Sequence, residues 1–159
     1  MRMEHLAIMR PHWGFIEKIV SGQKTIESRW YKHRSPPWGS IQAGERIYFK
    51  DAGKPVSVQA EVEKVLSFSN LTPQRVWTLL ETYGKENGIP AEQLPAFYER
   101  FKDKNYCLLI YLKNAQRIQP FEIDKRGFGM QAAWLCVESM DSLKREGRRP
   151  LDSATVDAL

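Results

Sequence analysis

The chain has 159 residues, of which 42% are hydrophobic and 27% charged, and its formal net charge is +5. This length suits one domain, and this balance excludes an intrinsically disordered protein. No apolar stretch approaches the roughly 20 residues of a membrane span, and the N-terminus has no signal-peptide core, so we expect a cytoplasmic protein with no membrane partner.

The N-terminal part of the chain shows the pattern strand, helix, strand. Residues 5–10 indicate a first strand, and the apolar face formed within 13–20 indicates a helix. Gly22 follows this helix, at the position where a C-cap requires positive φ. The alternation over 24–30 then predicts a strand whose odd-numbered side chains share one face.

A loop and a pair of strands come next. Residues 31–45 are rich in Ser, Pro and Gly and predict a long loop. Strands are expected at 46–50 and 56–68, joined by a turn at 51–54. The second of these strands is long enough to bend around a barrel.

The second half of the chain combines helices with strands. Thr72 and Pro73 supply an N-cap and a proline at the first helical position, which predicts a helix ending near Gly84 or Gly88. A shorter helix is expected over 91–102. Three further strands or apolar segments are expected at 106–113, 118–123 and 133–137.

Strands therefore dominate, and the regular alternation of a doubly wound sheet is missing. We predict an α+β, mostly β fold, a small and partly open barrel with flanking helices. The domain is expected over residues 1–140, and the polar segment 141–159 is expected to be a flexible tail.

The segment 22–34 concentrates charged and aromatic side chains. Glu27 and Arg29 share one strand face, while Lys24 faces the other way but follows a glycine turn, so its long stem can swing into the same cleft. Phosphate recognition uses mobile or forked cations, and base stacking uses flat rings, as Trp30 and Tyr31 provide. A solvated, salt-bridged edge strand with two anchoring aromatics would give the same pattern.

Several residues outside this strand are weaker candidates. Trp38 lies on a loop, as a stacking platform or folded back on the core, and Lys50 ends a strand, facing a cleft or plain surface. The loop 125–129 combines Lys125 and Arg126 with glycine and phenylalanine, as backbone-binding loops do. Trp134 is expected either in the core or as a pocket wall.

The sequence Ser21-Gly22-Gln23-Lys24-Thr25-Ile26-Glu27-Ser28-Arg29 resembles the G-x-K-x-x-E-x-R signature of ASCH domains (activating signal cointegrator homology). The segment 43–49 is similar to the family's entry to a barrel strand, and the resemblance covers roughly residues 5–125. It implies a PUA-like β-barrel that binds RNA or a modified nucleotide in a cleft. The implied roles are Gly22 for the turn, Lys24 and Arg29 as anion contacts, and Glu27 as acceptor or orienter.

The resemblance leaves other functions open. One branch of the family hydrolyses N4-acetylcytidine with a Lys, Thr and Glu set; here Lys24 matches the lysine, Glu27 stands where the threonine would be, and Glu86 is the expected counterpart of the glutamate. A small amidohydrolase acting on acylated nucleosides is therefore an alternative to RNA binding. A protein-interaction module that uses the charged loop and tail is a third.

The candidate nucleic-acid-binding residues are Gly22, Lys24, Glu27, Arg29, Trp30, Tyr31, Lys32, Arg34, Trp38, Lys50, Lys125 and Arg126. The net positive charge fits such a partner, because neutralised phosphates release their counterions. Cys107 and Cys136 are expected to be buried free thiols, and the histidines lack metal-ligand spacing. We expect no metal and no other cofactor.

Overall fold

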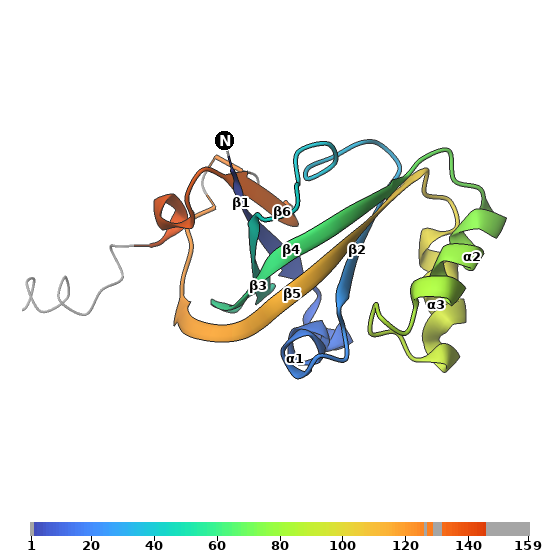
Figure 1. The fold of residues 1–159 in the computed structure, drawn as a ribbon, viewed down its shortest axis with the longest axis horizontal. Helices are drawn as coiled ribbons and strands as arrows, with labels where there is room; N and C mark the ends of the chain where they lie inside the picture. Colours follow the sequence, from blue (N-terminus) through green and yellow to red (C-terminus); the bar gives the residue numbers. More distant parts are fainter. Residues whose placement is uncertain (1, 126, 129–131, 146–159) are drawn as a thin grey trace, which may run out of the picture.

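The computed structural model describes residues 2–125, 127–128 and 132–145. These residues form one six-stranded sheet in the order β2-β5-β4-β3-β1-β6, curled into a half-barrel (Figure 1). β1 and β3 pair in parallel, and the other neighbouring strands pair antiparallel. The strands are β1 (Glu4–Met9), β2 (Ile26–Tyr31), β3 (Arg46–Asp51), β4 (Val56–Phe68), β5 (Tyr106–Phe121) and β6 (Trp134–Val137).

The long strands β4 and β5 run side by side along the molecule (Figure 1). β5 is continuous over 16 residues, so the two strands expected at 106–113 and 118–123 are one, and that prediction was wrong. The register between β4 and β5 shifts at three points, between Val56 and Lys64. Such bulges bend a strand without ending it, which allows β5 to continue through the polar residues after 112.

The helices begin and end where capping residues place them. α1 (Phe15–Ser21) ends at Gly22, whose φ of 84° is the left-handed conformation expected there. α2 (Pro73–Tyr83) begins after Thr72, whose hydroxyl accepts a hydrogen bond from the backbone N–H of Arg75. α3 (Leu94–Phe101) follows a 3-10 turn and packs beside α2 at one end of the molecule (Figure 1). None of the helices in the described part of the chain has the length and apolar character needed to traverse a bilayer.

The apolar core lies between the curled sheet and the helices, and a smaller cluster lies under the C-terminal turn. Met140–Leu143 forms a 3-10 turn in which Leu143 is only 3% exposed, and Lys144 pairs with Ile123 in an isolated bridge. The predicted domain boundary at residue 140 thus falls inside a packed turn. The rest of the predicted tail, 146–159, lies outside the described residues.

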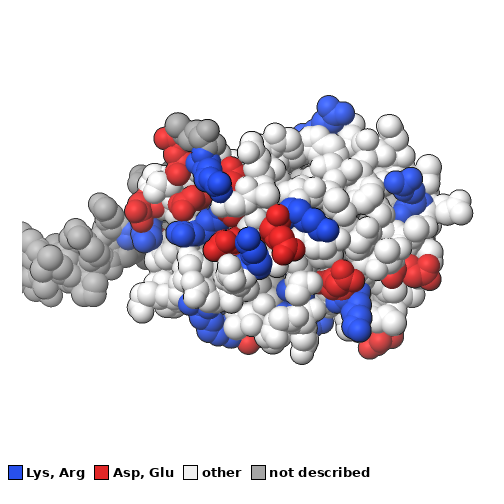
Figure 2. All heavy atoms as spheres, viewed as in Figure 1, with Lys and Arg blue, Asp and Glu red and all other residues white. Residues whose placement is uncertain are grey.

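Acidic and basic side chains lie next to one another on the face of the molecule shown in Figure 2. The net charge of +5 therefore does not form a continuous basic surface on this face. A local concentration of cations lies instead among the residues that line the hollow of the barrel.

Candidate functional site

A cavity of about 840 Å³ opens on the concave side of the barrel. Its volume lies within the range of roughly 300–1,000 Å³ that is typical of small-ligand pockets. β1, β2, the end of β3, α3 and the segments just before β6 contribute its walls. Because β2 and β6 are the two edges of the sheet, the cavity lies where the half-barrel is open.

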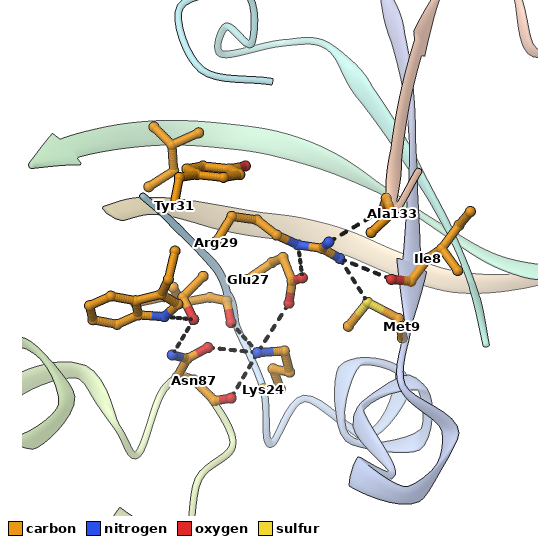
Figure 3. Close-up of polar contacts among 12 residues, drawn as sticks. Ile8, Met9, Lys24, Glu27, Arg29, Tyr31, Asn87 and Ala133 are labelled. Atoms are coloured by element: carbon orange, nitrogen blue, oxygen red, sulfur yellow. Dashed lines mark hydrogen bonds and ion pairs between the residues drawn. The ribbon is translucent and has the colours of Figure 1, made fainter. Parts of the chain in front are cut away.

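Three side chains of the signature form a chain of ion pairs beside this cavity (Figure 3). Lys24 Nζ lies 3.3 Å from Glu27 Oε1, and Arg29 Nε donates to Glu27 Oε2 at 2.8 Å. Glu27 and Arg29 share one face of β2, as the alternation predicts, and both line the cavity. Glu27 is the one carboxylate among the described residues that line it.

Lys24 lies behind the cavity and is not among its lining residues. Its side chain is fully buried, and its ammonium group donates to Ile26 O at 2.8 Å and to Asn87 O and Oδ1 at 2.8 and 2.7 Å. Burial lowers the pKa of Lys24 to about 8, although the charge of Glu27 opposes this shift. Lys24 reaches Glu27 as expected, but it supports the site and has no donor left for an anion in the cavity.

Arg29 connects the two edges of the half-barrel. Its guanidinium donates to Ala133 O at 3.3 Å and Ile8 O at 3.4 Å, so β2 is tied to the β1–β6 edge through a side chain (Figure 3). The same guanidinium lies 5.1 Å from the ring centre of Trp134. The indole of Trp134 donates to Nδ1 of the buried His5. Trp134 is therefore buried in the core, as one expectation has it, and it also contacts Arg29 in the cavity wall, which partly meets the other.

Lys50 is the buried cation that faces the cavity. It lies at the end of β3, is 9% exposed and lines the cavity. No hydrogen bond or ion pair joins its ammonium group to any residue in the described part of the chain. Burial lowers the pKa of Lys50, the charge of Lys125 lowers it further, and the charge of Glu122 opposes this shift. Lys125 also lines the cavity, where it donates to Ala132 O at 3.0 Å.

Aromatic rings form another part of the lining. Trp30 from β2 stacks on Phe101 from α3, with ring centres 4.9 Å apart and planes 7° apart. Phe101 contacts Phe97, and Phe97 contacts Trp13, so the rings follow one another along the wall. Trp30 was expected at the site, whereas Trp13, Phe97 and Phe101 lie in segments that the sequence predicts only as helices, at 13–20 and 91–102.

The other candidates of the N-terminal region lie outside the cavity lining. Trp38 packs back on Tyr106, and the guanidinium of Arg34 lies 5.4 Å from the centre of the Tyr106 ring. Tyr31 is half-buried, and Lys32 is exposed. Gly22 serves the helix end alone, and Arg126 lies outside the described residues.

Glu86 does not join the ion pairs of the signature. Its side chain is exposed and absent from the cavity lining, while its backbone carbonyl accepts from Thr25 N at 2.8 Å and Ile26 N at 3.0 Å. The neighbouring Asn87 contacts Lys24 instead. The hydrolytic set expected from the resemblance is therefore not assembled on the cavity wall.

The cavity residues that were missed as site residues in the sequence include the cations Arg10, Arg100 and Lys104 and the rings of Trp13, Phe97 and Phe101. They come from segments about 90 positions apart, and no local motif joins them. Within the described residues, no group of three or more His, Cys, Asp and Glu side chains is placed to hold a metal ion. Cys107 and Cys136 are both free, the first buried and the second half-buried.

Neither a protein-family model nor a curated protein matches the sequence. Solved structures do match: ASCH from Zymomonas mobilis has a TM-score of 0.61 at 22% identity, over 98% of this chain and 94% of its own. A mutant of that protein gives 0.61 at 21% identity, over 98% and 97%. The N-terminal domain of McrB from Staphylothermus marinus gives 0.50 at 14% identity, over 98% and 93%. The chain therefore has the fold of an ASCH domain, as the G-x-K-x-x-E-x-R signature predicts.

Proposed function

We propose that the chain binds RNA or a modified nucleotide in the cavity between β2 and the β1–β6 edge. The observation that carries this proposal is Lys50, a residue that is 9% exposed and lines the cavity, and whose ammonium group has no hydrogen bond or ion pair in the described residues. Burying a charge without a directly bonded partner is costly, and an anionic group of a ligand offsets that cost.

The charges of the lining point to the same ligand class. The cations Arg10, Arg29, Lys50, Arg100, Lys104 and Lys125 line the cavity, against Glu27 as the carboxylate. A phosphate suits this excess of positive charge, and the rings of Trp13, Trp30 and Phe101 offer flat surfaces for a base. A ligand that carries both groups, a nucleotide, uses both parts of the lining.

Glu27 adds a hydrogen-bond acceptor to the cavity. Each carboxylate oxygen has two lone-pair sites, and the ion pairs with Lys24 and Arg29 occupy one on each oxygen. Glu27 therefore retains the capacity to accept from an amino group of a base. Because Lys24 and Arg29 hold it from two sides, its orientation is set before the ligand arrives.

The decisive variant is Lys50→Met, which keeps an unbranched side chain of similar length and removes its charge. We expect it to weaken binding of a labelled single-stranded RNA by about 1.5–3 kcal/mol, the range for a hydrogen bond to a charged group. Fluorescence anisotropy over a series of salt concentrations measures this, and wild-type affinity should fall steeply with salt.

The control is Arg75→Ala, which also removes one positive charge, on α2 and outside the cavity lining. Equal losses for the two variants would indicate attraction by net charge alone. Unchanged binding in Lys50→Met would contradict the proposal. The amidohydrolase hypothesis receives less support, because Lys24 and Glu86 do not line the cavity, and unchanged N4-acetylcytidine after long incubation would remove it.

A further inference from the structure

Two arginines stack on one tryptophan at the mouth of the cavity. The guanidinium of Arg10 lies 5.5 Å from the ring centre of Trp13, and that of Arg100 lies 5.2 Å from it. Arg10 follows β1 and Arg100 lies in α3, so the fold brings them together from distant parts of the chain. We call Arg10 and Arg100 the arginine rim.

The arginine rim carries positive charge that the described residues leave unpaired. Neither Arg10 nor Arg100 forms an ion pair with a carboxylate in the part of the chain that the structure describes. Burial and the nearby charge of Arg10 lower the pKa of Arg100, so the two guanidinium groups repel each other. An anion placed beside both groups would relieve this repulsion.

The position of the rim distinguishes it from the interior of the cavity. Arg10 and Arg100 are exposed and yet line the cavity, whereas Lys50 is buried within it. Trp13 connects the rim to the aromatic wall through Phe97, at 5.2 Å between ring centres. A chain of nucleotides with one base against this wall would carry its neighbouring phosphates past the rim.

We propose that the arginine rim binds the phosphates that flank the nucleotide held in the cavity, so that the ligand is a single-stranded polynucleotide and not a free nucleotide. This inference rests on the proposed function, since it presupposes a nucleotide in the cavity. Guanidinium groups present forked donors that match phosphate oxygens, and stacking on Trp13 orients both forks before binding.

The experiment compares two probes on the same variants of the full chain. The first probe is a short labelled single-stranded RNA, and the second is a mixture of the four nucleoside 5′-monophosphates used as competitor. The double variant Arg10→Ala/Arg100→Ala should weaken RNA binding by about tenfold or more. It should also reduce the magnitude of the log–log salt slope by about 1.4, or about 0.7 for each lost phosphate contact. Competition by the monophosphates should stay unchanged.

The matched control is Arg75→Ala/Lys85→Ala, which removes two exposed cations outside the cavity lining and should leave both probes nearly unaffected. Equal loss for RNA and monophosphates in the rim variant would overturn the inference, since the rim would then belong to the nucleotide site itself. No loss for RNA would overturn it as well. A wild-type chain that binds monophosphates as tightly as RNA defeats this inference alone, whereas one that binds neither probe defeats the proposed function.

Discussion

Lys24 and Lys50 are both buried lysines beside the same cavity, and their surroundings are opposite. The ammonium group of Lys24 has three oxygen partners within 2.8 Å and a carboxylate at 3.3 Å. That of Lys50 has none among the described residues, and a second lysine, Lys125, lies near enough to lower its pKa. A buried charge with its partners built in holds a structure together, whereas one without them is costly until a ligand arrives. Lys24 therefore belongs to the scaffold and Lys50 to the binding site.

The largest effect expected from this comparison is the loss of stability in Lys24→Met. The variant leaves the buried Glu27 with Arg29 alone and removes the donor for two carbonyls and the Asn87 side chain. Breaking a buried pair from one side costs about 3–5 kcal/mol. Urea unfolding at neutral pH measures the free energy of unfolding, and a loss below about 1 kcal/mol would contradict a scaffold role for Lys24.

A second effect should appear when the same two proteins are unfolded at rising pH. The pKa of Lys24 is about 8 in the folded chain, below its ordinary value of 10.5. Between these values the unfolded chain binds more protons, so the wild type gains stability as pH rises through this window. The gain relative to Lys24→Met should approach about 3 kcal/mol by the upper end of the window. A constant difference between the two proteins would mean that Lys24 keeps an ordinary pKa.

The sequence predicts the structural contacts around Lys24 better than it predicts the residues that line the cavity around Lys50. Gly22 as a helix end and the shared face of Glu27 and Arg29 follow from local rules, because caps and alternation depend on neighbouring residues. β4 matches its predicted bounds of 56–68 for the same reason. The partner of Lys24 was not predicted: the family resemblance names Glu86, whereas the folded chain presents Asn87, the next residue.

The lining of the cavity depends on contacts between distant segments, and local sequence patterns do not contain this information. Phe97 and Phe101 look like the apolar face of any amphipathic helix, and only the packing of α3 against β2 turns them toward a cavity. Lys50 lies at the end of a predicted strand, and the local pattern does not decide between an exposed and a buried side chain. Its burial follows from the parallel pairing of β3 with β1, a long-range feature of the sheet.

The smallest effect on stability is expected at Lys50, and this variant tests whether Lys50 differs from Lys24 in its role. Lys50→Met removes a partly desolvated charge, its repulsion with Lys125 and its attraction to Glu122, without breaking any hydrogen bond or ion pair within the described residues. The free energy of unfolding should stay the same or rise by up to about 1 kcal/mol, because a buried charge without a partner opposes folding. Urea unfolding without RNA, beside the binding assay on the same preparation, measures both quantities. A variant that keeps its stability but loses RNA affinity would mean that the buried charge of Lys50 contributes to RNA binding and not to folding. If it loses as much stability as Lys24→Met does, Lys50 is a second scaffold residue, and the argument that its charge awaits a phosphate no longer holds.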